Sequence, residues 1–391
     1  MTRVVFAIPG DLASRTGGYA YARALLDHLP ERGIAIRHCA LPGSFPHPSE
    51  ADVVATMRAL RATEKDDVLL IDGLAFGALP ADQVATLDRA IVALIHHPLG
   101  FETGLTDAMR QALIDSERAA LACADHIIVS SDTTRDALVG DFGVDANAIT
   151  IAEPGTPPVT SRSLPPCGGG SGRGVGPLSQ TVLAGPDNSS GQRDPPPQPS
   201  PTRGEGAPAT LRILAIGSVV PRKGFDILID ALADLRDLDW HLRLVGSLDR
   251  SPATAEALRT QIAASGIADR VDLVGELGAE SLAKEYAAAD LFVLSSHYEG
   301  YGMVLAEAMT HGLPIVTTTG GAAARTVPDA AALKVAPGDA PALAGALRRV
   351  LSDAALRRDL AAASEIAGKL LPRWPATAAK VAAVLHQVAR A

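Results

Sequence analysis

Two glutamates stand close together in the stretch 295–321, which also carries glycines and apolar runs. The run Leu291–Leu294 before them predicts a buried strand, and Met303–His311 predicts a helix. Glu299 lies in the loop before this helix, and Glu307 lies within the helix. A carboxylate accepts several hydrogen bonds, so both side chains suit the vicinal hydroxyls of a sugar or a ribose. The alternative is that both are ordinary carboxylates favoured near a helix start.

The loop between this strand and this helix contains Gly300 and Gly302. A glycine loop at a helix start directs unpaired backbone N–H groups and the positive end of the helix dipole at one place. Glycine also lets a ligand approach the backbone closely. The stretch therefore predicts a binding site for a phosphate or a sugar.

A second loop between a strand and a helix carries two cations, Arg222 and Lys223. Leu211–Ile216 predicts the strand, and Phe225–Leu235 predicts the helix. Cations at a helix start oppose the helix dipole, which favours anions there. A bound diphosphate resolves this conflict, whereas the alternative is a pair of solvated surface charges.

The first part of the chain offers two glycines and two histidines as candidates. Gly17 and Gly18 end the loop after the first apolar strand, where they either admit a phosphate or form a plain tight turn. His96 and His97 follow the strand Ile91–Ile95. Ligands of parallel sheets bind at the carboxyl ends of the strands, so one histidine is expected near a reacting group. A purely structural histidine pair is the alternative.

Strands alternate with helices along most of the chain, which predicts an α/β fold with parallel sheets covered on both faces. Asp132 or Thr133 is expected to cap the helix that runs to Val139. Residues 161–210 are rich in proline, glycine and serine and predict a disordered insertion or linker.

The composition bounds the function. A chain of 391 residues is expected to hold two sizeable domains, and a net charge of −9 argues against a nucleic-acid partner. No apolar run is long enough to span a bilayer, and the N-terminal apolar run is too short for a signal peptide. The cysteines lack metal-ligand spacing and indicate a reduced cytoplasm. Cys39 and Cys123 are expected to be buried free thiols, and Cys167 is expected to be exposed.

The segment 299–321 resembles the E-x7-E signature of family 4 retaining glycosyltransferases, the glycosyl transferase group 1 enzymes; it reads EGYGMVLAEAMTHGLPIVTTTGG. The likeness includes the preceding Ala289-Asp290, the stop at Gly312-x-Pro314 and the turn Gly320-Gly321. The resemblance implies the GT-B fold, in which two doubly wound Rossmann-like domains face a cleft. It implies an acceptor-side domain over 1–160 and a nucleotide-sugar domain over 211–374, with a closing helix over 375–391 that packs back on the first.

The resemblance also implies roles for single residues. Glu299 would contact the donor sugar, and Glu307 would contact the ribose. Lys223 matches a diphosphate-binding lysine, but Ser218 stands where the family has arginine, and Arg222 is expected to supply that charge. The strand end at Gly275 and Leu277 would lie against the base. The expected catalytic residues are Glu299, Lys223, Arg222 and His96, and the expected substrate-binding residues are Gly17, Gly18, His97, Gly302, Met303, Val304, Leu305, Glu307, Gly275 and Leu277.

The function implied is retaining transfer of a sugar from a UDP- or GDP-sugar to a glycan, lipid or small-molecule acceptor, without a metal or other cofactor. The protein is expected in the cytoplasm, with peripheral contact to the inner face of the membrane left open, and with a role in cell envelope polysaccharide. The E-x7-E motif argues against an epimerase or a phosphorylase. Family 4 enzymes often have a His-Asp or similar pair where this chain has His96-His97. This difference and Ser218 leave open a second alternative, a non-catalytic relative that binds nucleotide sugars as a partner subunit.

Overall fold

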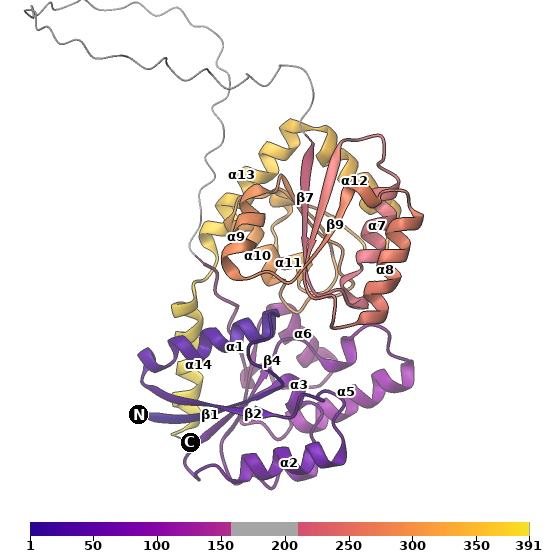
Figure 1. The fold of residues 1–391 in the computed structure, drawn as a ribbon. Helices are drawn as coiled ribbons and strands as arrows, with labels where there is room; N and C mark the ends of the chain where they lie inside the picture. Colours follow the sequence, from indigo (N-terminus) through magenta and orange to yellow (C-terminus); the bar gives the residue numbers. More distant parts are fainter. Residues whose placement is uncertain (158–209, 391) are drawn as a thin grey trace, which may run out of the picture. The chain divides into compact units, whose positions relative to one another are not determined.

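The computed structural model describes residues 1–157 and 210–390. These residues form two six-stranded sheets of parallel strands, each covered by helices on both faces (Figure 1), as the alternating pattern predicted. We call 1–157 the N-terminal half and 210–373 the C-terminal half. The predicted disordered segment 161–210, apart from Thr210, and the predicted exposure of Cys167 lie outside the described residues.

The first sheet has the strand order β2-β1-β3-β4-β5-β6. Its central strands are continuous apolar runs because a parallel sheet is buried on both faces. The strand order changes direction between β1 and β3, which creates a switch point where the loops after the two strands diverge. The strands are β1 (Thr2–Pro9), β2 (Ile34–Leu41), β3 (Val68–Asp72), β4 (Ile91–Ile95), β5 (His126–Val129) and β6 (Ile149–Ile151).

Successive side chains of β1 enter two different cores because side chains alternate across a strand. Val4 and Phe6 pack against α1 and the C-terminal helix α14, whereas Val5 and Ala7 face the core on the side of α2, α3 and α5. The α-helices of this half are α1 (Gly17–His28), α2 (Glu50–Arg61), α3 (Gly73–Phe76), α4 (Ala81–Val84), α5 (Asp107–Leu121) and α6 (Asp132–Gly140).

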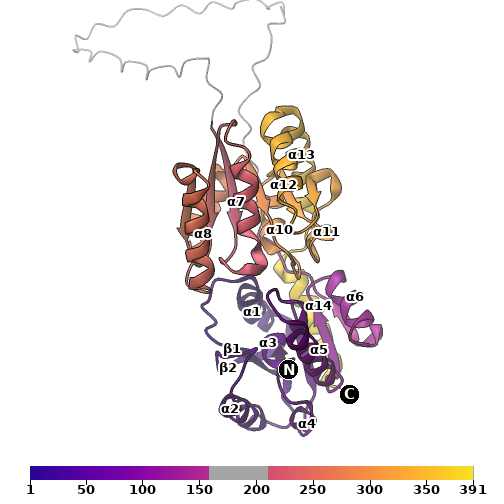
Figure 2. The ribbon, with the colours of Figure 1, turned by 90° about the vertical axis from the view of Figure 1, so that its right-hand side faces the viewer.

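The second sheet has the order β12-β11-β10-β7-β8-β9, so its switch point lies between β7 and β10. α7, α8 and α12 cover one face and α9, α10 and α11 the other; Figure 2 shows α7 beside α8. The strands are β7 (Leu211–Ile216), β8 (Trp240–Val245), β9 (Val271–Gly275), β10 (Leu291–Leu294), β11 (Ile315–Thr318) and β12 (Ala332–Val335). The α-helices are α7 (Phe225–Ala233), α8 (Pro252–Ala264), α9 (Ala279–Ala288), α10 (Met303–Thr310), α11 (Ala323–Thr326), α12 (Ala340–Ser352) and α13 (Ala354–Leu370).

The last helix, α14 (Trp374–Val388), packs on the first sheet beside α1. Its apolar face, which includes Val381 and Leu385, joins the core with β1. The ring of Trp374 meets Tyr21 edge-on at 5.5 Å between centroids. Gly155 lies directly against the backbone of Trp374, where an added Cβ would come within 2.5 Å of Trp374 Cα, so any side chain at this position would displace α14. The chain thus returns to the N-terminal half after completing the C-terminal half.

Short 3₁₀ turns occupy several connections between these elements. They are η1 (Pro30–Arg32), η2 (Leu99–Phe101), η3 (Ala146–Ala148), η4 (Pro221–Lys223), η5 (Ala268–Arg270) and η6 (Asp329–Ala331). Among the described residues, no helix has both the length and the apolar character needed to cross a membrane.

Two local predictions are wrong. Ser131, not Asp132 or Thr133, caps α6, because its hydroxyl oxygen accepts the N–H of Thr134 at 3.0 Å. Cys39 and Cys123 are free thiols but only half-buried, because both lie at the margin of the core rather than within it.

Candidate functional site

A cavity of about 400 Å³ lies at the carboxyl ends of the strands of both sheets, within the single compact unit that the described residues form. The loops after β1, β3 and β4 line it from the N-terminal half, and the loops after β7, β8 and β10 line it from the C-terminal half. Both switch points therefore open into one space, as expected for an open α/β sheet. The predicted site residues that line it are Gly17, Gly18, His96, His97, Arg222, Lys223, Glu299, Gly302, Met303 and Val304.

An ion pair joins the two loops of the second switch point. Lys223 Nζ lies 2.5 Å from Glu299 Oε1, and the hydroxyl of Ser296 donates to the same oxygen at 2.5 Å. Glu299 is only 6% exposed, so the pair is largely shielded from water. The second carboxylate oxygen, Oε2, accepts no hydrogen bond from the described residues, which leaves an acceptor available to a ligand.

Burial and charge act in opposite directions on this pair. Burial acts to raise the pKa of Glu299, but the charges of Lys223 and Arg222 outweigh burial and lower it. Burial also lowers the pKa of Lys223, and the carboxylate of Glu299 opposes that effect. We conclude that the pair is ionised at neutral pH, because a close opposite charge favours the charged form of each partner.

Arg222 connects the C-terminal half to a loop of the N-terminal half. Its Nη1 donates to the carbonyl of Tyr298 at 2.7 Å, and its Nε lies 3.2 Å from Glu102 Oε1. The contact with Glu102 is an ion pair without hydrogen-bond alignment, because Nε has no hydrogen-bond partner among the described residues. Glu102 also meets His97 Nε2 at 3.3 Å. Partial burial acts to raise the pKa of Glu102, but His97 and Arg222 lower it to about 2.

His96 lies above the first switch point with its ring against Tyr21, at 5.2 Å between centroids. Burial lowers the pKa of His96 to about 4, with a smaller contribution from His97, so the ring is neutral near pH 7. Its Nε2 is 3.7 Å from Asp72 Oδ2 and has no hydrogen-bond partner in the part of the chain that the structure describes. Burial raises the pKa of Asp72 to about 6. A neutral imidazole and a weakly acidic carboxyl group thus adjoin the cavity.

The start of α10 supplies backbone donors to the same cavity. Gly302 adopts φ +87°, a left-handed conformation that glycine accommodates without strain, and an added Cβ would lie 2.9 Å from Leu305 Cδ1. The N–H groups of Met303 and Val304 have no acceptor among the described residues. These free donors and the positive end of the helix dipole favour an anion here.

Four predicted site residues lie outside the lining of this cavity. Leu305 is fully buried in the core beneath α10, and its N–H donates to the carbonyl of Gly302 at 2.9 Å. Glu307 Oε2 accepts the hydroxyl of Tyr286 at 2.8 Å, and burial raises the pKa of Glu307. Gly275 ends β9 with φ +77°, and Leu277 packs partly buried against the core of α9 and α10.

The structure adds residues that the sequence did not indicate. Glu102, Arg15 and Arg250 line the cavity, and Asp72 contacts His96. Asp72 ends β3, the neighbour of the strand β4 that precedes His96, so it lies at the carboxyl end of a parallel strand, where ligands of such sheets bind. Glu102, Arg15 and Arg250 lie in irregular loops, where the sequence has no periodicity from which to predict the direction that a side chain faces.

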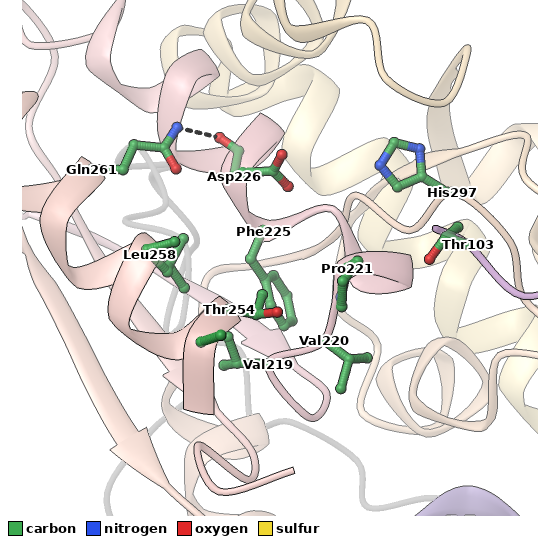
Figure 3. Close-up of a pocket in the computed structure, with 12 residues that line it drawn as sticks. Thr103, Val219, Val220, Pro221, Phe225, Asp226, Thr254, Leu258, Gln261 and His297 are labelled. Carbon is green, nitrogen blue, oxygen red and sulfur yellow. Dashed lines mark hydrogen bonds between the residues drawn. The ribbon is translucent and has the colours of Figure 1, made fainter. Parts of the chain in front are cut away.

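A second cavity, of about 550 Å³, lies behind η4 between α7 and α8 (Figure 3). Its lining is mostly apolar and includes Val219, Phe225 and Leu258. Gln261 at its rim donates to the carbonyl of Asp226 at 2.9 Å. Among the described residues that line it, Asp226 is the only carboxylate and none is a lysine or an arginine. A phosphate group is therefore better matched by the first cavity, which four cationic side chains line.

Groups of three or more His, Cys, Asp or Glu side chains arranged to hold a metal ion are absent from residues 1–157 and 210–390.

Two family descriptions match the chain. Residues 210–353 match "Glycosyl transferases group 1", and residues 3–155 match "Glycosyl transferase 4-like domain". The two matches together take in nearly all of the elements that line the first cavity. They confirm the family resemblance predicted from the segment 299–321.

Curated relatives with similar sequences include enzymes that are named as glycosyltransferases. Mannosylfructose-phosphate synthase of Agrobacterium fabrum is 38% identical over 29% of this chain and 27% of its own length. D-inositol 3-phosphate glycosyltransferase of Xylanimonas cellulosilytica is 28% identical over 72% of this chain and 61% of its own length. This chain therefore spans less than two thirds of the length of either relative.

Solved structures share the fold over nearly the whole chain. Sucrose-phosphate synthase from Thermosynechococcus elongatus superposes with a TM-score of 0.75 at 20% identity, covering 99% of both chains. HepE of Anabaena, in complex with UDP and glucose, gives a TM-score of 0.70 at 16% identity over 99% of this chain and 100% of that chain. These similarities confirm the predicted GT-B architecture of two Rossmann-like sheets.

Proposed function

Because this chain belongs to the group 1 glycosyltransferases, we propose that it transfers a sugar from a nucleotide diphosphate sugar to an acceptor hydroxyl, with retention at the anomeric carbon. The observation that carries the proposal is the contact of Lys223 with Glu299 at 2.5 Å beside the free N–H groups of α10. A cation and backbone donors suit a diphosphate, and an adjacent carboxylate suits a sugar hydroxyl. The donor would therefore lie across the second switch point.

The leaving group of such a transfer is a nucleoside diphosphate, on which negative charge builds up. Lys223 and Arg222 are the side chains proposed to stabilise this charge, together with the N–H groups of Met303 and Val304. A charge-assisted hydrogen bond contributes about 1.5–3 kcal/mol. Two or three that strengthen in the transition state give a rate factor on the order of 10³ or more, without a metal.

Glu299 is proposed to hold hydroxyl groups of the donor sugar through Oε2, since Oε1 already accepts from Lys223 and Ser296. Glu307 is proposed to hold the ribose through the oxygen that does not bind Tyr286. Gly275 and Leu277 would then lie beside the base. Leu305 is proposed to act through its packing, because its side chain is buried and holds the first turn of α10.

The N-terminal half is proposed to bind the acceptor. Gly17 and Gly18 start α1 at the cavity, and Gly18 lies close to His96, since an added Cβ would be 3.4 Å from the His96 ring. A neutral His96 can accept a hydrogen bond from an acceptor hydroxyl or a donor hydroxyl. His97 would position Glu102 rather than contact the reacting sugar. The domain division proposed is 1–160 for the acceptor side and 211–374 for the nucleotide sugar, with the closing helix on the first.

The donor is proposed to be a UDP- or GDP-sugar. UDP is the nucleotide in the HepE structures, which share this fold. The acceptors named for the curated relatives differ from one another, which is consistent with a glycan, a lipid or a small molecule here. A cytoplasmic reaction that supplies cell envelope polysaccharide remains part of the proposal.

A thermal-shift screen with UDP, GDP, ADP and their sugar derivatives tests the function. One nucleotide should raise the melting temperature of the wild type, and Lys223→Ala should abolish that shift. Lys284→Ala is the matched control, because Lys284 is an exposed lysine that pairs with Glu280 on α9. Sugar release from the active donor would then distinguish an enzyme from a non-catalytic binding subunit. No shift with any nucleotide would contradict the donor site.

A further inference from the structure

The lining of the first cavity carries more positive than negative charge. Arg15, Arg222, Lys223 and Arg250 face it together with two carboxylates, Glu102 and Glu299, so its formal charge is +2. Burial keeps the ring of His96 uncharged at neutral pH, so His96 adds nothing to this sum. This excess stands out in a protein whose net charge is −9.

The two cations at the second switch point are already paired. Lys223 contacts Glu299, and Arg222 lies between Glu102 at 3.2 Å and Glu299 at 3.8 Å. Both carboxylates are held in the ionised form by these contacts. The excess positive charge therefore belongs to Arg15 and Arg250, neither of which forms an ion pair with any described residue.

Arg250 is fixed to the side of the cavity where Lys223 lies. It belongs to the loop between β8 and α8, which starts at Gly246 with φ +153°. Gly246 packs directly on the carbonyl of Gly217, since an added Cβ would lie 1.9 Å from that oxygen. The carbonyl of Ser247 also accepts the N–H of Val219 at 2.8 Å. The loop of Arg250 thus rests on the loop that leads from β7 to Lys223.

The guanidinium of Arg250 also reaches the start of α1 across the cavity. Burial raises the pKa of Tyr19, and the charge of the nearby Arg250 opposes that rise. Arg15 precedes α1 and lacks any comparable attachment to the loop after β7. Of the two cations without an ion pair among the described residues, Arg250 is therefore the one whose loop packs on Gly217, and it lines the cavity together with Ser218 and Lys223.

We propose that Arg250 binds the diphosphate of the donor and supplies positive charge in addition to that of Lys223 and Arg222, both of which are paired with carboxylates. This inference rests on the proposed function and adds a residue to its donor site. A diphosphate is negatively charged on both phosphates, and guanidinium groups bind such anions through two parallel hydrogen bonds. Bound between Lys223 and Arg250, the diphosphate would neutralise the excess charge of the cavity.

Isothermal titration with UDP and GDP, and with the corresponding nucleosides, tests the inference. Arg250→Ala should weaken binding of the nucleoside diphosphate about tenfold or more, which is the size of one charge-assisted hydrogen bond. Binding of the nucleoside without phosphates should not change. Arg259→Ala is the matched control, because Arg259 is an exposed arginine on α8 that pairs with Glu256. The salt dependence of diphosphate binding should also be smaller in Arg250→Ala than in the control.

Each outcome decides a different claim. In one outcome the wild type binds a diphosphate, Lys223→Ala loses this binding, and Arg250→Ala binds as well as Arg259→Ala. This outcome would refute the role of Arg250 and leave the proposed function standing. Equal weakening of the diphosphate and the bare nucleoside would also refute it, because the effect would not arise at the phosphates. If the wild type binds neither diphosphate, the proposed function and this inference fail together.

Discussion

At the scale of single residues, Glu299 is proposed to link the cation of the donor site to the sugar. One oxygen accepts from Lys223 and Ser296, and the other is left for a ligand. The carboxylate can hold this position only because Lys223 and Arg222 lower its pKa against the effect of burial. In the proposed mechanism its charge therefore serves both to orient Lys223 and to accept hydroxyl groups of the sugar.

The variant Glu299→Gln should lower turnover by about 10²–10³-fold, because an amide presents Lys223 with a weaker partner and no longer stabilises its buried charge. The folded protein should persist, since Gln fills the same volume. Initial rates with the donor identified by the thermal screen provide the measurement. Glu280→Gln, at an exposed position on α9, is the control and should keep the wild-type rate. A rate for Glu299→Gln within a few-fold of this control would contradict the role given to the carboxylate.

Single residues also show how far the sequence could predict the site. Glu299, the glycines of the loop before α10 and Lys223 were predictable as lining residues, because each occupies a fixed place between a strand and a helix. Glu102 was not, although it contacts both His97 and Arg222. Its position depends on the turn η2 and on the contact of that turn with Glu117 of α5, and neither leaves a periodic pattern. Arg250 escaped prediction for the same reason, since only packing of its loop on Gly217 brings it to the cavity.

At the scale of elements, α5 holds the loop that carries Glu102. Glu117 of α5 is fully buried, and its Oε2 accepts the N–H of Leu99 in η2 at 2.8 Å. Its other oxygen has no partner among the described residues. Burial raises the pKa of Glu117 to about 8, against the effect of the Leu99 N–H, so the side chain is protonated near pH 7. A neutral carboxyl group thus anchors the loop.

This protonation predicts a loss of stability as the pH rises. The unfolded state releases the proton of Glu117 near its ordinary pKa of about 4.3, whereas the folded state keeps it until about pH 8. Stability contributed by the protonated form is therefore fully present below about pH 4 and declines as the pH approaches 8. Glu117→Gln keeps an acceptor for Leu99 and cannot ionise, so it should not show this decline.

Melting temperatures of the wild type and Glu117→Gln at pH 5.5 and pH 8 measure the effect. The variant should gain several degrees on the wild type at the higher pH, since each unit of pKa shift corresponds to about 1.4 kcal/mol. Asp115→Asn, at an exposed position on the same helix, controls for a change of charge on α5. A constant difference between Glu117→Gln and the wild type at the two pH values would show that Glu117 does not titrate as proposed.

The elements themselves were predictable where their pattern is strong. The strands β4, β7 and β10 match the expected bounds, because each is a largely continuous apolar run between loops. The short helix α3 was not expected, because one turn has no periodicity. The cap of α6 was misplaced by one residue, since Ser131, Asp132 and Thr133 are all good capping residues and only tertiary structure selects among them. Ser131 also donates to the carbonyl of Gly300 at 2.6 Å, a contact absent from any local pattern.

At the scale of the whole molecule, all the proposed charge stabilisation comes from side chains and backbone donors of two sheets that meet at one cavity. Lys223, Arg222 and Arg250 come from loops after β7 and β8, and the N–H groups come from the start of α10. The proposed mechanism needs no divalent ion. The general plan was predictable because the alternating strands and helices require parallel sheets, whereas the meeting of the two sheets at one cleft was implied only by the family resemblance.

Activity should therefore survive removal of divalent metals. Rates measured after dialysis against EDTA should equal those of the untreated protein within about twofold, because the cations and dipoles of the site replace a metal in stabilising the leaving group. The assay is repeated after addition of Mg²⁺ or Mn²⁺ to the treated protein. Loss of activity that Mn²⁺ restores would overturn the metal-free mechanism.

The tight approach of Gly300 to His96 limits how this protein can be recombined with its relatives. An added Cβ at Gly300 would lie 2.2 Å from the His96 carbonyl, so the loop that carries Glu299 touches the backbone of the opposite half. In a hybrid enzyme whose N-terminal half comes from a relative, the backbone carbonyl at the position of His96 must leave the same space for Gly300. Only then would the loop that carries Glu299 keep its position. A change at this contact in one half must therefore be matched by the other, as at the contacts of Arg222 with Glu102 and of Ser131 with Gly300.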